Sequence, residues 1–164
     1  MATTISAATL TVTITESVTL NGSDQGASNV ATYGSVNEVV KRIVSIPHDS
    51  ETGILGMGAA ISTDLSKSYV AGLFAEGDVR YIRITNKDDS NHVTLTFKSE
   101  NNHEFAVKLD ALQSFIYPCD MAGGVVDTMD ANTSALTVAL EDLVDVVAQA
   151  DTATCDLEVF VASV

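Results

Sequence analysis

Val79–Leu109 reads VRYIRITNKDDSNHVTLTFKSENNHEFAVKL and contains three short strand-like runs, of which the second and third alternate between apolar and polar residues. The turn-forming sequence KDDSN separates residues 79–86 from residues 92–99, and ENN separates the latter from residues 103–109. Side chains that alternate in this way lie on opposite faces of a strand, and Asn, Asp and Ser favour tight turns. The stretch therefore predicts two consecutive antiparallel hairpins.

The same alternation occurs earlier, in residues 9–20, TLTVTITESVTL. Odd positions carry hydroxyl side chains, and even positions are apolar apart from Glu16. We expect a strand with its apolar side in the core and its threonine side outward. Glu16 would be accommodated by a bulge, by a sheet edge, by an arginine partner or by a subunit contact. The expected core residues are Leu10, Val12, Ile14, Val93, Leu95, Phe97, Phe105, Val107 and Leu109.

Most of the remaining chain also has the composition of short strands bounded by turns. Residues 21–29, rich in Gly, Asn and Ser, predict a loop, and Ser50–Gly77 predicts a thin strand followed by a long loop. Residues 140–150 fit a helical turn and a strand equally well. Further strands are expected at residues 38–47, 113–118 and 155–164.

No repeat and no linker divides the sequence, so we expect a single domain over residues 1–164. Eight to ten short strands at regular spacing favour an all-β fold, an antiparallel β-sandwich that is jelly-roll-like, with at most one or two short helices.

Composition restricts the classes of partner. The 164 residues include 8 basic and 22 acidic ones, giving a formal net charge of -14, while 46% are apolar. The apolar content is sufficient for a folded core. The excess of acidic over basic residues opposes a general affinity for nucleic acid or for an anionic membrane. We expect no secretory signal and no membrane span, hence a chain made in the cytoplasm. Cys119 and Cys155 lack any CxxC spacing, and two buried thiols are favoured over a disulfide.

Candidate metal ligands are few. His92 and His103 could approach each other across the second hairpin beside Glu104, but no third ligand is evident. Asp88 and Asp89 suggest calcium, although a hairpin turn already accounts for them. Asp120, Asp127 and Asp130 form a second acidic group that suggests calcium, and turn residues again account for it.

No nucleophile motif and no phosphate-binding glycine loop occurs in the sequence. We therefore expect no catalytic residue, no cofactor and no metal site. The candidate interface residues are Thr11, Thr13 and Thr15, on the uncharged side of the first strand, together with Arg80 and Arg83, which break an otherwise apolar strand.

Three segments of the sequence, residues 9–26, 78–117 and 151–164, resemble β-rich structural proteins of tailed bacteriophages, particularly marine ones. The resemblance implies a virion component without enzymatic activity. It implies a partner among major capsid or tail proteins, and a homo-oligomer for which a trimer is favoured.

A capsid decoration or cement protein on the outer surface of the head is the favoured form. A tail or fibre component is the near alternative, and a carbohydrate-binding β-sandwich module for host adhesion is another. The segment Ser50–Gly77 has no counterpart in the resemblance, so a partner contact there stays open.

Overall fold

The computed structural model describes residues 6–57, 68–69, 73–117 and 140–164. The described chain is almost entirely strand, and its helical content there is one three-residue 3₁₀ turn, η1 (Glu76–Asp78). Within these residues no helix is long and apolar enough to cross a membrane. The expectation of an all-β chain is confirmed.

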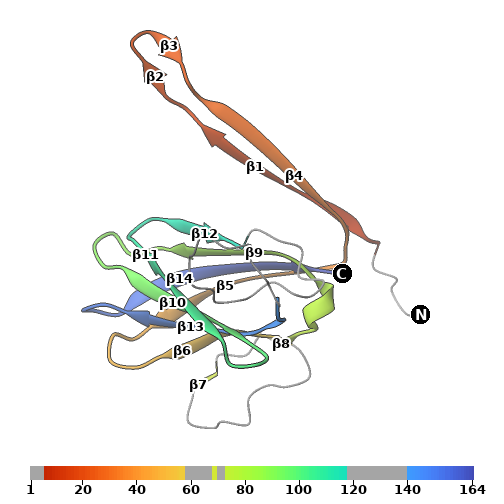
Figure 1. Ribbon diagram of the computed structural model, residues 1–164, viewed down its shortest axis with the longest axis vertical. Helices are drawn as coiled ribbons and strands as arrows, with labels where there is room; N and C mark the ends of the chain where they lie inside the picture. Colours follow the sequence, from red (N-terminus) through yellow and green to blue (C-terminus); the bar gives the residue numbers. More distant parts are fainter. Residues whose placement is uncertain (1–5, 58–67, 70–72, 118–139) are drawn as a thin grey trace, which may run out of the picture.

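Two antiparallel sheets pack against each other (Figure 1). The four-stranded sheet has the order β12-β9-β14-β5, and its strands are β5 (Glu38–Ile46), β9 (Val79–Asn86), β12 (Ser114–Ile116) and β14 (Cys155–Ser163). The second sheet has the order β11-β10-β13-β6-β7, with β8 also on β6. Its strands are β6 (Thr52–Met57), β7 (Ser68–Tyr69), β8 (Leu73–Phe74), β10 (Val93–Ser99), β11 (Glu104–Leu109) and β13 (Leu143–Ala150). Strands β7 and β8 pair parallel to β6, whereas the other pairs are antiparallel.

The chain passes between the two sheets at almost every connection. It runs from β5 to β6, back to β9, across to β10 and β11, back to β12, across to β13 and finally to β14. The first of these eight strands, β5, pairs with the last, β14. This strand order, which the sequence left open, is that of an eight-stranded jelly roll, the fold class that the sequence favoured.

The core lies between the sheets. Phe97 is fully buried, with its ring centroid 4.8 Å from that of Phe105, 5.0 Å from Phe115 and 5.4 Å from Tyr117. The predicted core positions Val93, Leu95, Phe97 and Leu109 are buried, and Phe105 and Val107 pack against them partly buried.

The first predicted hairpin is wrong, because β9 and β10 belong to different sheets. The turn between them is an arch fastened by Asn86, whose buried side-chain amide donates to the carbonyls of Asn91 and Leu109. The second predicted hairpin, β10 with β11, is confirmed in full register from Val93↔Leu109 to Lys98↔Glu104.

Of residues 140–150, which fitted helix and strand equally, Leu143–Ala150 forms β13 between β10 and β6. Six of its eight residues are buried, so the strand shows an apolar run rather than an alternation. A strand covered on both faces has this pattern, which overlaps with that of a buried helix.

The N-terminal strand does not join the sandwich. β1 (Ala8–Glu16) pairs with β4 (Ala27–Val36), and β2 (Thr19–Leu20) pairs with β3 (Ser23–Asp24), forming a hairpin that projects from the sandwich (Figure 1). We call residues 8–36 the arm. The loop predicted for residues 21–29 is wrong, since the turn is only Asn21-Gly22, with φ of 51° and 79°. Positive φ at both positions is the geometry of a type I′ turn, which Asn-Gly favours.

Candidate functional site

The arm is anchored to the sandwich at its base. Val36, Tyr81 and Ala162 are buried there, and Leu10 and Tyr33 of the arm pack against them. The ring centroids of Tyr33 and Tyr81 are 5.6 Å apart. The arm is therefore seated on the outward face of the four-stranded sheet.

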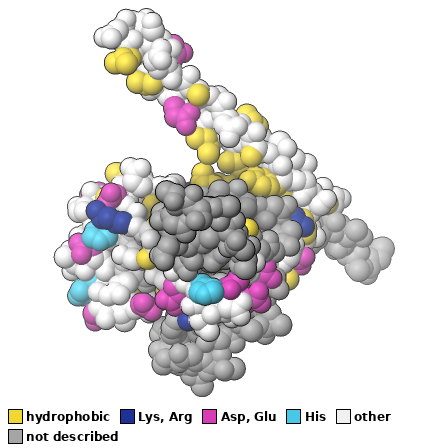
Figure 2. All heavy atoms as spheres, in the orientation of Figure 1, with side chains coloured by type: hydrophobic (Ala, Val, Ile, Leu, Met, Phe, Trp, Pro, Cys, Tyr) yellow, Lys and Arg dark blue, Asp and Glu magenta, His cyan; other side chains and the backbone are white. Residues whose placement is uncertain are grey.

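A groove of about 330 Å³ lies beneath the arm. We call it the arm groove. Its floor is the outward face of the four-stranded sheet, and its upper wall is β1, where side chains of both faces reach the rim. Its lining residues are Leu10, Thr11, Val12, Thr13, Ile14, Tyr81, Arg83, Ile116 and Phe160. Figure 2 shows apolar side chains gathered at this junction and continuing along the arm.

The charge in the arm groove is already compensated. Arg83 is its charged residue, and its guanidinium Nη2 lies 2.7 Å from Oε1 of Glu158 and its Cζ 5.8 Å from the ring centroid of Phe160. Arg83 and then Lys41 lower the pKa of the Glu158 carboxyl from its usual range. Burial raises the pKa of Tyr81, with Arg83 opposing this shift. The groove thus offers a mixed surface, in which apolar side chains lie beside hydroxyl groups and one ion-paired arginine.

The outer face of the arm carries the predicted threonines. Thr11, Thr13 and Thr15 are exposed, and their cross-strand partners on β4 are Thr32, Val30 and Ser28, in that order. Oγ1 of Thr15 lies 3.3 Å from Oγ of Ser28. Val30 is 57% exposed on this face. We call these residues the threonine face.

The opposite face of β1 is not in the core. Leu10 and Val12 are half-buried over the arm groove, and Ile14 is 42% exposed. Leu10 and Val12 pack against the small buried cluster at the base of the arm rather than between the two sheets, and the prediction of core burial is wrong for Ile14, because the arm projects and only its base meets the sandwich. Glu16 is exposed at the distal end of β1, which agrees with the sheet-edge interpretation of this residue. Val18 and Leu20 are also exposed towards the tip.

The two predicted arginines have different positions. Arg83 lines the arm groove together with Thr11 and Thr13. Arg80 lies at the start of β9, where Nη1 donates to the carbonyl of Gly77 at 2.7 Å, and it is not among the groove residues. The structure therefore brings Arg83 and two of the threonines together and leaves Arg80 apart.

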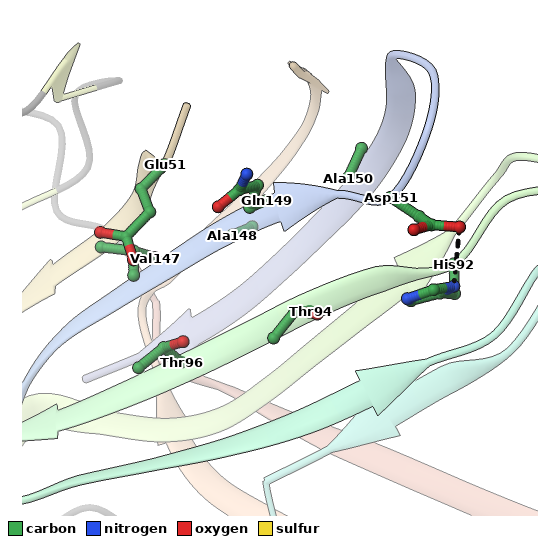
Figure 3. A pocket seen from close by; sticks show the side chains of 9 residues that line it. All are labelled: Glu51, His92, Thr94, Thr96, Val147, Ala148, Gln149, Ala150 and Asp151. Carbon is green, nitrogen blue, oxygen red and sulfur yellow. Dashed lines mark ion pairs between the residues drawn. The ribbon is translucent and has the colours of Figure 1, made fainter. Parts of the chain in front are cut away.

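A second depression, of about 260 Å³, lies on the outward face of the other sheet. Figure 3 shows Thr94 and Thr96 in a row along β10, with Asp151 and His92 at one end of the depression. Nδ1 of His92 lies 3.5 Å from Oδ2 of Asp151, and Gln149 donates to the carbonyl of His48 at 2.9 Å. None of the described residues that line the depression is Phe, Tyr or Trp.

His92 and His103 do not approach each other, because antiparallel pairing places them at opposite ends of the β10–β11 hairpin. His103 instead lies 2.8 Å from Glu141, which also accepts a hydrogen bond from the buried Ser99 hydroxyl. These contacts lower the pKa of Glu141, with Ser99 as the larger cause. The Glu141 carboxylate lies between the Ser99 hydroxyl and the His103 imidazole, so His103 is not placed to take the proton of Ser99. The cluster fastens the β10–β11 turn to the segment before β13.

Asp88 is a turn residue. Its Oδ1 accepts from the backbone N–H groups of Asn91 and Ser90 at 2.6 and 2.8 Å, and these bonds lower its pKa. Within the described ranges no group of three His, Cys, Asp or Glu side chains could hold a metal ion. Asp120, Asp127, Asp130 and Cys119 lie outside those ranges, and Cys155 is buried and free.

Sequence reasoning missed β4 and the groove residues Ile116 and Phe160. The Asn21-Gly22 pair, followed by the uncharged, strand-prone residues 27–36, was the signal that could have revealed a hairpin. Nothing in the sequence links Phe160 to β1, since that contact depends on long-range packing. Comparison of this chain with protein-family models, with curated proteins and with solved structures gives no match.

Proposed function

We propose that this chain is a non-enzymatic structural component of a tailed-bacteriophage virion, most specifically a capsid decoration protein on the outer surface of the head. The observation that supports this function is the arm, a hairpin that projects from a folded sandwich and carries exposed apolar and hydroxyl side chains. The resemblance of residues 9–26, 78–117 and 151–164 to phage structural proteins supplies the class of particle.

The arm has the composition of a contact surface. Among residues 8–36 only Glu16 and Asp24 are charged, whereas the described residues of the sandwich carry many acidic and basic side chains (Figure 2). Cores of protein interfaces are depleted in charged residues, and an isolated two-stranded hairpin has marginal stability in water. Docking of the arm on a capsid or tail protein would cover its exposed side chains and leave the acidic sandwich facing solvent.

A lysine substitution tests the threonine face. Replacing Thr11, Thr13 and Thr15 together by Lys should abolish binding to purified particles, measured by co-sedimentation, while the circular dichroism spectrum stays that of a β protein. The matched control adds three lysines to the other sheet through Thr94→Lys, Thr96→Lys and Ala106→Lys, and should bind normally. Full particle binding by the arm variant would refute docking through this face.

The site on the particle is tested separately. In particles purified from a culture that carries the gene, mass spectrometry should detect the chain and immunogold should label the head. Gold on the tail would replace the decoration role with the tail or fibre role. Absence of the chain from purified particles would overturn the virion function itself.

The carbohydrate-binding alternative would use the polar depression around Thr94 and Thr96. It offers hydroxyl, amide and carboxylate groups, but sugar sites usually add a Trp, Tyr or Phe ring for stacking, and none of these is among its described lining residues. Binding to a glycan array that disappears in a Thr94→Lys variant would favour this alternative over the structural role.

A further inference from the structure

The free strand edges of the described residues differ in how well they are protected against pairing. β5 contains Glu38, Lys41 and Arg42, and β11 contains Glu104 and Lys108, whereas β7, β8 and β12 have only two or three residues each. Charged residues and short length are the usual protections of an edge strand. The long edges of the arm have almost none of this protection.

β1 is the less protected of the two long edges. It pairs with β4 alone among the described strands, and it has nine residues, no proline and no charge before the terminal Glu16. The edge of β4 is interrupted near its end by Ser35, with φ of 60°. β1 also forms the wall of the arm groove, so a strand added to its edge would lie beside a floor made of Tyr81, Ile116, Phe160 and the ion-paired Arg83.

The sequence of β1 is complementary to itself. An antiparallel pair centred on Val12 places Leu10 opposite Ile14 on the groove side, and Thr11 opposite Thr13 on the threonine face. Apolar groups thereby meet apolar groups, and hydroxyls meet hydroxyls, which is the arrangement that stabilises cross-strand pairs. Two-fold pairing of identical strands also closes the contact, so that assembly stops at two copies.

We propose that the free edge of β1 is a self-association site, at which β1 of a second copy pairs antiparallel about Val12 and joins the two arms into a four-stranded sheet. Each copy then contributes its Ile14 to the apolar surface beside the other copy's arm groove. The contact is two-fold and takes the place of the trimer favoured from the sequence. This self-association site deepens the proposed function. It rests on that function only because both treat the arm as the part of the chain that serves in assembly.

A second copy fits this edge because the occupant must be a neutral, strand-forming segment. Residues 8–15 have that character and are available in every other copy. The joined arms would also present one larger threonine face, built from both copies, while the groove side of both arms faces the sandwiches.

The first test uses two exposed apolar residues on opposite faces of the arm. Sedimentation velocity of the purified full chain should show a dimer. Ile14→Lys, on the groove side of β1, should weaken dimerisation roughly a hundredfold or more, because the two-fold axis repeats each substitution. Val30→Lys, on the threonine face of β4, should leave the dimer intact. A monomeric wild type, or equal effects of the two variants, would overturn the proposal.

The second test fixes the register. In a Cys119→Ser background, Val12→Cys should form a disulfide-linked dimer under mild oxidation, because the two copies of residue 12 lie opposite each other. Val30→Cys on β4 should remain largely uncrosslinked. Efficient crosslinking at Val30 but not at Val12 would assign the contact to the other edge, and a trimer in sedimentation velocity would contradict two-fold pairing.

These experiments contain no phage particles, so their outcome is independent of the particle-binding assay. A dimer that fails to bind particles would retain the self-association site and remove the virion role. A monomer that binds particles through the threonine face would retain the virion role and remove the self-association site.

Discussion

Asn86 illustrates how one buried polar side chain can determine a connection between sheets. Its amide nitrogen lies 2.8 Å from the carbonyl oxygen of Asn91 and 3.2 Å from that of Leu109, and its oxygen accepts from the N–H of Asp88 at 3.0 Å. A buried amide with three partners replaces the backbone pairing that a hairpin would provide. The arch between β9 and β10 therefore depends on this residue.

Replacing Asn86 by Leu should lower the free energy of unfolding by about 2–4 kcal/mol, because backbone groups in the arch lose partners away from water. Urea unfolding measured by fluorescence or circular dichroism would give this value. The exposed Asn37→Leu variant is the control and should change stability by less than about 0.5 kcal/mol. Similar stabilities for the two variants would show that the arch does not need the amide.

Glu158 makes a contribution that depends on pH. Arg83 and Lys41 hold its pKa in the folded protein below the usual value of 4.5, so its stabilising effect is present above that pH and is lost as pH falls through the lowered pKa. Glu158→Gln should cost about 1 kcal/mol at pH 7, a small value because Lys41 is well exposed. The stabilities of variant and wild type should converge as the pH falls through the lowered pKa of Glu158; a difference that stays constant over the whole acidic range would contradict this origin.

At the scale of elements, the sequence predicted strands better than it predicted their partners. The β10–β11 hairpin was correct, because a short turn and matching alternation are both local. The β9–β10 arch has equally good turn residues, yet its strands enter different sheets. A turn can either pair the two strands that it joins or lead them into two different sheets. For the turn between β9 and β10, the outcome depends on the packing of β12 and β14, whose residues are distant from the turn in the sequence.

The arm shows the same limit in the candidate site. Alternation in residues 9–16 correctly predicted a strand with a threonine face, and the uncharged character of that face was visible in the sequence. It did not reveal that the apolar face of Ile14 is left uncovered, since a period of two says which side chains share a face and not what lies against it. Arg83 lies in the groove and Arg80 is held at the start of β9, and a partner contact of either arginine stays a prediction.

The arm should differ from the sandwich in hydrogen exchange. In the monomeric Ile14→Lys variant, backbone amides in residues 13–16 and 27–30 should exchange at least about a hundredfold faster than those of β13 and β14, because the residues of the distal arm are exposed and those of β13 and β14 are mostly buried. In the wild type at high concentration, amides of β1 should become protected. Equal protection of arm and sandwich in the monomeric variant would show that the hairpin is stable alone.

At the scale of the whole molecule, charge and contact surface are separated. The formal net charge of -14 belongs mostly to the sandwich, while the arm carries two acidic residues. Two copies joined through their arms therefore bring like-charged sandwiches near each other, and salt screens this repulsion.

Dimerisation should accordingly become stronger as salt is added. Between about 0.05 and 0.5 M sodium chloride, the dissociation constant should fall roughly three- to tenfold, as screening weakens the repulsion between the sandwiches. Sedimentation equilibrium at several salt concentrations would measure it. A dissociation constant that rises with salt would instead indicate a contact held by ion pairs, which the uncharged edge of β1 does not offer.

The position of β14 has a consequence for synthesis on the ribosome. β14 is the last described strand in chain order, yet it lies in the middle of its sheet, paired with β5 on one side and β9 on the other. Until residues 155–163 leave the exit tunnel, β5 and β9 have no neighbour between them, and the sandwich cannot close. The arm, whose two long strands are joined by a short turn, can form much earlier. Nascent chains of this protein would therefore display an assembly surface before they have a core.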